Sequence, residues 1–148
     1  MTTKTLNTAR VHTTGGREGA ALSSDHQLDI RLSPAGSHRP GTNPEQLFAA
    51  GWSACFEGAL GFAAKESGVE LPEDTAVDAE VSLNRSEEEG YSLTARLNVS
   101  IPGLPDDIAQ SLIDRAHQTC PYSKMTRDGI ETSLALAVAA LLFRRLRG

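Results

Sequence analysis

The apolar stretch from Leu47 to Ala64 constrains the fold of this chain more than any other segment. Its residues are apolar or small on nearly every side, a pattern typical of a helix that is buried all round. Asn43 can act as the N-cap, Pro44 suits the first helical position, and Gln46 completes a spacing like that of a capping box. A helix of this kind in a chain of 148 residues needs cover on both sides, which favours a second subunit.

The continuity of the helical region, about 44–67, decides which of its residues can meet. Glu45 and Cys55 are ten residues apart, which is about 15 Å along one straight helix and too far for contact. Gly51 and Ser53 offer a break, and Ser53 as a second N-cap would place Cys55 in the first turn of a new helix. Amide donors and the positive end of the dipole favour a thiolate there. We therefore predict two helices, with Glu45 folded back toward Cys55.

The remaining segments predict an α+β fold with antiparallel sheets packed on the central helix. Alternating apolar residues indicate strands, helically spaced apolar residues indicate a helix, and clustered prolines and glycines indicate loops. The expected strands are 4–13, 20–24, 28–32, 77–83, 91–101 and 130–138, the expected helix is 105–119, and the expected loops are 33–42 and 68–74. The last strand would place Thr132, Leu134, Leu136 and Val138 on one face.

Length and composition favour one domain over residues 1–148, long enough for a real core. Its hydrophobic fraction is 39%, its charged fraction 22%, its net charge −5 and its pI about 5.3. This acidic balance argues against a nucleic-acid partner. No segment resembles a signal peptide or reaches the roughly 18 apolar residues of a membrane span, so we expect a cytoplasmic protein without a membrane partner. Two cysteines in that compartment are typical of catalysis or metal binding.

Three separated stretches carry a family resemblance. They are GGREG at 15–19, GTNPEQLFAAG and SACF between residues 41 and 56, and CPYS at 120–123. Together they resemble the organic hydroperoxide resistance (Ohr) family of the OsmC-like superfamily, over roughly residues 4 to 138. Residues 139–148 depart from the family pattern; they could extend as a basic amphipathic helix, and we assign them no function.

The two cysteines suit the reduction of a peroxide. A thiolate attacks one oxygen and becomes a sulfenic acid, with which a second thiol condenses to a disulfide. Cys55 at a helix start would be the attacking residue, and Cys120 at a helix end, where the dipole disfavours a thiolate, would be the resolving one. The resemblance implies the same roles. It also makes Arg17 the cation that stabilises the thiolate and Glu45 the carboxylate that orients Arg17 in a bidentate pair.

The resemblance further implies a thiol-dependent peroxidase for organic hydroperoxides, without haem, flavin or metal. Hydrophobic residues near the cysteine suit an apolar peroxide, and the predicted substrate pocket consists of Leu47, Phe48, Trp52 and Phe56. The family forms intertwined homodimers with sites near the interface and is recycled by dihydrolipoyl groups on lipoylated proteins. The sequence leaves open which subunit supplies Arg17 to a given site.

Other chemistries have less support from the sequence. A zinc site could use the two cysteines with histidines, but no C-x-x-C or H-x-x-x-H spacing occurs. A hydrolase pairing Cys55 with His117 lacks a supporting motif. The best alternative from another class is a non-catalytic module that binds an apolar ligand, which would not need both cysteines.

Overall fold

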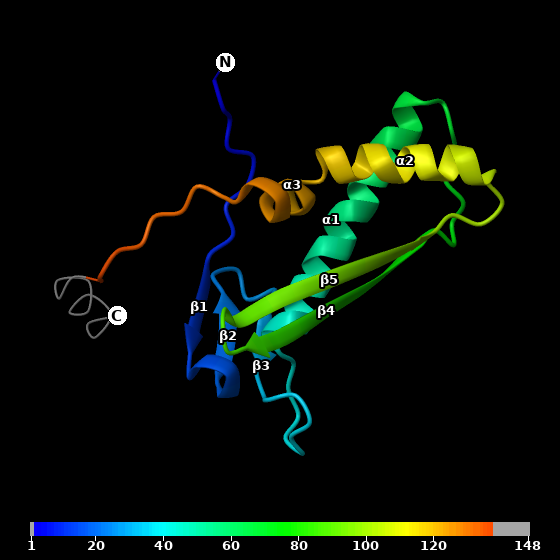
Figure 1. Cartoon of the computed structure of the whole chain (residues 1–148). Coiled ribbons are helices and arrows are strands. Elements are labelled where there is room, and N and C mark those ends of the chain that lie inside the picture. Colours follow the sequence, from blue (N-terminus) through cyan, green and yellow to red (C-terminus); the bar gives the residue numbers. More distant parts are fainter. Residues whose placement is uncertain (1, 138–148) are drawn as a thin grey trace.

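The computed structural model describes residues 2–137 and has an α+β architecture, as predicted. A long helix, α1, runs through the centre, with two shorter helices across it and two antiparallel sheets beside it (Figure 1). The helices are α1 (Pro44–Glu66), α2 (Asp106–Thr119) and α3 (Pro121–Asp128), with a short 3-10 turn η1 (Gly16–Glu18). The strands are β1 (Val11–Thr14), β2 (Ala20–Ser23), β3 (Asp29–Arg31), β4 (Ala76–Ser86) and β5 (Gly90–Ser100).

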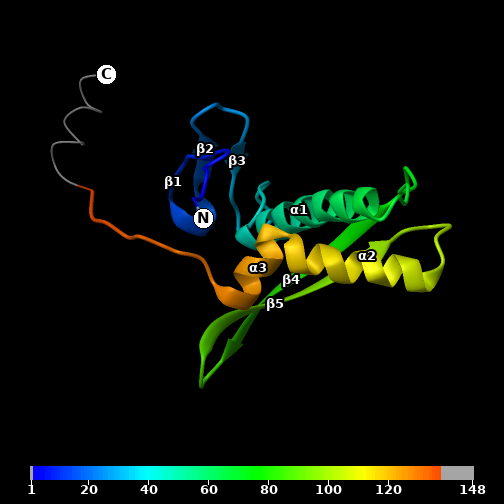
Figure 2. The same cartoon turned by 90° about the horizontal axis from the view of Figure 1, so that it is seen from above.

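The sheets are built from local hairpins. Strands β1, β2 and β3 pair in chain order near the start of α1, and β4 and β5 form a separate ribbon whose register runs from Ala76 opposite Ser100 to Ser86 opposite Gly90. The ribbon crosses α1, and Figure 2 shows α2 beside the same helix. The expected strands 20–24, 28–32, 77–83 and 91–101 are confirmed and pair as two hairpins, and the expected helix 105–119 is confirmed as well.

The core lies where α1 meets the ribbon and α2. Leu60, Leu112, Ala116 and Cys120 are almost completely buried there. The predicted cap of α1 is confirmed, because the Gln46 backbone N–H donates to the Asn43 side chain at 2.9 Å. The described residues 2–137 cover one face of α1 and leave the other open, where Phe62 is 73% exposed.

The prediction of two helices between residues 44 and 67 is wrong, because α1 is continuous from Pro44 to Glu66. Ser53 does not cap a new helix; its hydroxyl donates to the carbonyls of Ala49 and Ala50 in the preceding turn, at 2.7 and 3.2 Å. Gly51 serves tertiary packing, since a Cβ there would lie 2.7 Å from the Tyr122 hydroxyl oxygen. Gly51 and Ser53 therefore both have roles inside a continuous helix, and neither interrupts it.

Two predicted strands are shorter or missing because the described part of the chain supplies no neighbouring strand beside them. Only Val11–Thr14 of the expected strand 4–13 pairs with β2. Residues 130–137 form no strand, and Leu134 and Leu136 are 94% and 93% exposed. This segment runs away from the helices in both views (Figures 1 and 2). Val138 and residues 139–148, for which a helical extension was considered, lie outside the described residues.

Helix α3 has no counterpart among the predicted elements, because a proline just after the expected helix 105–119 is compatible with the end of that helix as well as with the start of a new one. In the structure Pro121 occupies the first position of α3 and Cys120 its N-cap, an arrangement that proline favours.

Contrary to the expectation from the sequence, α1 has the length and mean hydropathy of a membrane span. This is weak support for a membrane location, since the core helix of a soluble protein meets the same criterion.

Candidate active site

The two cysteines meet where α1 passes the junction of α2 and α3. Their sulfur atoms are 3.3 Å apart, with the Cys120 thiol donating toward the Cys55 sulfur. Both are free thiols, and Cys120 is fully buried whereas Cys55 is half-buried. A disulfide needs a sulfur–sulfur distance of about 2.05 Å, so this is a reduced pair that a small movement can join.

Hydrogen bonds from both α2 and α3 fix the junction between these helices, where Cys120 lies. Cys120 closes α2, where its N–H donates to the Ala116 carbonyl at 2.8 Å, and it also precedes the first turn of α3. Arg127, in the last turn of α3, reaches back and donates to the His117 carbonyl at 2.6 Å. The carbonyl groups that end α2 are thus satisfied by the helix that follows.

Cys55 does not have the electrostatic setting that the sequence predicted. It lies in the middle of α1 rather than in a first turn, so the dipole of its own helix does not favour a thiolate. Burial raises the pKa of Cys55, and the neighbouring Cys120 sulfur raises it further, while the backbone N–H of Tyr122 acts in the opposite direction. The described residues of this chain alone therefore leave Cys55 mainly as a thiol at neutral pH.

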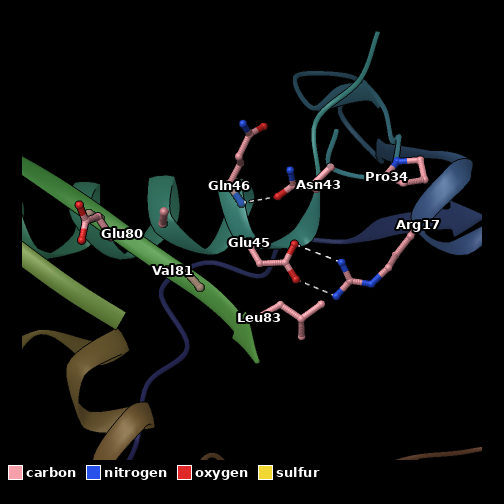
Figure 3. A pocket seen from close by; sticks show the side chains of 11 residues that line it. Arg17, Pro34, Asn43, Glu45, Gln46, Glu80, Val81 and Leu83 are labelled. Atoms are coloured by element: carbon pink, nitrogen blue, oxygen red, sulfur yellow. Dashed lines mark hydrogen bonds and ion pairs between the residues drawn. The ribbon is translucent and has the colours of Figure 1, made fainter. Parts of the chain in front are cut away.

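Arg17 and Glu45 form the bidentate pair that the sequence predicted. Figure 3 shows the Arg17 guanidinium reaching Glu45 in the first turn of α1, with nitrogen–oxygen distances of 2.8 and 3.1 Å. The Arg17 hydrogen bond lowers the pKa of Glu45, and Glu45 in turn raises the pKa of Arg17. The carboxylate is mostly covered while the guanidinium is half exposed, so Arg17 keeps surface for a further anionic partner.

The structure brings the four predicted catalytic residues together as two separate pairs. Glu45 and Cys55 occupy one continuous helix, and ten residues of helix place them about 15 Å apart along its axis. Within one chain, the expected contact between the Arg17–Glu45 pair and the Cys55 sulfur is not made, because the helix break on which it depended does not exist.

Two cavities flank the Arg17–Glu45 pair, and Leu83 lines both of them. The larger, of about 760 Å³, lies between the start of α1, the loop around Pro34 and strand β4 (Figure 3). The smaller, of about 370 Å³, is lined mainly by apolar and aromatic side chains, including Phe48, Tyr91 and Leu93. A charged pair with apolar walls suits a ligand that has one polar end and an apolar body.

The predicted pocket residues lie in different environments. Phe48 lines the smaller cavity, Leu47 is half-buried, and Trp52 and Phe56 belong to the core. Sequence reasoning missed Leu83, Tyr91 and Leu93 because they come from a distant hairpin. It also missed Tyr122 and Ser123, although both belong to the CPYS motif.

Among residues 2–137, no cluster of three or more histidine, cysteine, aspartate or glutamate side chains is placed to hold a metal ion.

Comparison with known proteins assigns this arrangement to a family. The model of the OsmC-like protein family matches residues 34–135. An organic hydroperoxide resistance protein from Xanthomonas axonopodis pv. citri is 44% identical over 138 residues, which cover 90% of this chain and 96% of that protein. The chain belongs to the Ohr family of OsmC-like proteins.

Solved Ohr structures share its fold. The crystal structure of the organic hydroperoxide resistance protein OhrB of Bacillus subtilis superposes with a TM-score of 0.79 at 41% identity, covering 90% of this chain and all of that one. An Ohr protein from Legionella pneumophila gives a TM-score of 0.78 at 38% identity, covering 91% of this chain and all of that one. The resemblance drawn from the sequence motifs is thus confirmed for both family and fold.

Proposed function

We propose that this chain is a thiol-dependent peroxidase that reduces organic hydroperoxides to alcohols and serves in defence against them. The observation that carries the proposal is the pair of free thiols, Cys55 and Cys120, with sulfurs 3.3 Å apart. The names of its relatives, organic hydroperoxide resistance proteins, indicate the substrate class. Apolar walls beside the Arg17–Glu45 pair suit a hydroperoxide with an organic body.

The reaction uses the two thiols in sequence. The Cys55 thiolate attacks the terminal oxygen of the hydroperoxide, the O–O bond breaks, and the alkoxide leaves and takes up a proton to become the alcohol. Cys55 is then a sulfenic acid, whose oxygen leaves as water when the Cys120 sulfur bonds to the Cys55 sulfur. A dithiol, which we expect to be a dihydrolipoyl group on a lipoylated protein, reduces the disulfide. No metal, haem or flavin enters this scheme.

The working unit in this proposal is a homodimer. Along the uncovered side of α1, the exposed positions include four small residues at helical spacing, which would allow a second helix to approach closely: Ala50, Ala54, Gly58 and Gly61. The exposed segment 130–137, with alternating leucines, has the pattern of a strand without a partner. A second copy would cover both features, as in an intertwined dimer.

A dimer also brings a cation to Cys55. Position 50 lies midway between positions 45 and 55, so a two-fold axis passing near Ala50 would place Glu45 of one copy opposite Cys55 of the other. The Arg17–Glu45 pair of one copy would then serve the Cys55 of the second. Arg17 would lower the pKa of that Cys55 against the effect of burial, and its free donors would hold the peroxide.

The activity is tested by adding one equivalent of cumene hydroperoxide to the fully reduced protein. We expect loss of two thiols per hydroperoxide, release of the alcohol, and one Cys55–Cys120 disulfide within a chain, identified by mass spectrometry. Cys55→Ser should abolish the reaction, whereas Cys120→Ser should still permit one oxidation of Cys55. Reversed results for the two variants would reverse the roles, and retention of both thiols in the wild type would favour the alternative, a non-catalytic module for an apolar ligand.

We also propose a cytoplasmic location, since the two thiols must be reduced to act.

A further inference from the structure

A buried hydrogen bond joins α1 to α3 beside the two cysteines. The indole N–H of Trp52 donates to the Ser123 hydroxyl oxygen at 3.1 Å. The two residues lie 71 positions apart in the chain; Ser123 is fully buried and Trp52 is 8% exposed. Cys55 follows Trp52 by three residues and therefore lies next to it on the same face of α1.

The contacts between α1 and the first turn of α3 form one continuous face. On α1 it comprises Phe48, Gly51, Trp52 and Cys55, which recur at helical spacing. The Tyr122 ring packs beside Phe48, with centroids 6.1 Å apart, and its hydroxyl end lies over Gly51. The first turn of α3 is thereby held next to the Cys55 sulfur.

Helix α3 is short, and its first turn carries its contacts with α1. It is eight residues long, and Ser123 is its only fully buried residue. Because Cys120 both ends α2 and precedes α3, the angle between these helices determines where the Cys120 sulfur lies. The Arg127 contact with the end of α2 restrains α3 against α2. The Ser123 hydrogen bond and the packing of Tyr122 restrain it against α1, and of these two only the hydrogen bond is buried and directional.

We propose that Ser123 and Trp52 are positioning residues, whose hydrogen bond holds the Cys120 thiol at attacking distance from Cys55. The inference rests on the proposed two-cysteine chemistry. The sulfurs must approach from 3.3 Å to about 2.05 Å when the disulfide forms. A misplacement of about 1 Å can slow a reaction by about 100-fold, so the orientation of α3 sets the rate of this step.

The test measures disulfide closure without hydroperoxide. Reduced protein is equilibrated with glutathione disulfide: the Cys55 thiolate displaces one glutathione to form a mixed disulfide, and the Cys120 thiolate then attacks the Cys55 sulfur and displaces the second. The ratio of intramolecular to mixed disulfide, determined by mass spectrometry after acid quenching and multiplied by the concentration of reduced glutathione, gives the effective concentration of Cys120. We expect Ser123→Ala and Trp52→Phe to lower it by about 10- to 100-fold.

A double variant separates positioning from stability. Each single change leaves one buried polar group without its partner, whereas Trp52→Phe with Ser123→Ala removes both groups and leaves no unpaired buried donor or acceptor at this contact. Positioning requires the double variant to keep the low effective concentration. Recovery of the wild-type value in the double variant, or single variants within twofold of the wild type, would overturn the proposal. Ile101→Val, a buried change at the opposite end of α2 from Cys120, is the matched control and should leave the ratio unchanged.

A second readout uses hydroperoxide. Slow closure leaves the Cys55 sulfenic acid exposed to a second hydroperoxide molecule, which oxidises it to the sulfinic acid and is itself reduced to the alcohol. We therefore expect Ser123→Ala to gain more of the species carrying two added oxygen atoms than the wild type. If wild-type protein did not reduce hydroperoxides at all, the proposed function would fail, while the glutathione measurement would still decide the positioning role.

Discussion

A mixed-dimer experiment tests whether Arg17 of one subunit serves Cys55 of the other. One partner carries Arg17→Ala and the other carries Cys55→Ser. If the residues act within one chain, neither chain of the heterodimer has a complete site. If they act across the interface, the heterodimer has one complete site, made from the Cys55 of the first chain and the Arg17 of the second.

The size of the effect follows from the geometry. Because the helix between Glu45 and Cys55 is unbroken, action within one chain would have to span about 15 Å, beyond a Debye length of about 8 Å at physiological salt. With random reassociation of a symmetric dimer, about half of the dimers are mixed, so action across the interface restores about one quarter of the wild-type sites. A heterodimer purified through two different tags should have about half of the wild-type activity.

The assay is the initial rate of cumene hydroperoxide reduction with a dithiol reductant. Each variant alone should be weak or inactive, because Cys55→Ser lacks the nucleophile and Arg17→Ala lacks the cation. A nearby opposite charge lowers a pKa by about one to three, so half-maximal alkylation of Cys55 in Arg17→Ala should occur at higher pH than in the wild type. The same Cys55→Ser subunit mixed with an Arg17→Ala, Cys55→Ser subunit is the control and should stay inactive. A heterodimer without activity, although both chains are present in equal amounts, would refute action across the interface.

Three further predictions concern packing, assembly and pH. Gly51→Ala should lower the free energy of unfolding, measured by urea denaturation, by about 1–3 kcal/mol. The reason is that the Cβ of the alanine would lie 2.7 Å from the Tyr122 hydroxyl oxygen; unchanged stability would contradict that packing. Leu134→Ser with Leu136→Ser should shift the protein from dimer to monomer in sedimentation experiments, whereas an unchanged dimer would exclude a role for this segment in assembly. Arg17 lowers the pKa of Glu45 in the folded protein. The ion pair therefore stabilises the fold above the unfolded-state pKa of Glu45, and this contribution is lost as the pH falls through the lower, folded-state pKa. Glu45→Gln should remove that part of the acid dependence of the unfolding free energy; an identical acid profile in the two proteins would contradict this.

Local features of this chain were readable from its sequence because they depend on neighbouring residues. Asn43 caps α1 through a backbone N–H three residues away, and the β4–β5 hairpin forms between two alternating segments joined by a short turn. The family was identifiable for a similar reason, since its motifs are short and contiguous. The bidentate contact between Arg17 and Glu45 came from that resemblance rather than from any local rule.

Most of the errors arise where the deciding partner lies far away in the chain. Gly51 and Ser53 together read as a helix break, but Gly51 is required by Tyr122, and the Ser53 hydroxyl is satisfied within the helix. Pro121 is compatible with both the end of one helix and the start of the next, and only the fold shows that it starts α3. Residues 130–137 alternate like a strand, but a strand needs a neighbour, which the described part of this chain does not supply.

The separation of the two residue pairs links thiol reactivity to assembly. In one chain, burial and the Cys120 sulfur raise the pKa of Cys55, while the Arg17 cation remains paired with Glu45 at the start of the helix. A monomer would therefore carry a Cys55 thiol of raised pKa, and the proposed dimer would place a cation beside it. Dilution should then lower the activity per subunit more steeply than it lowers the amount of folded protein. If the cation comes from the second subunit, a substitution that weakens the proposed dimer should raise the pKa of Cys55 even when it changes neither Cys55 nor Arg17.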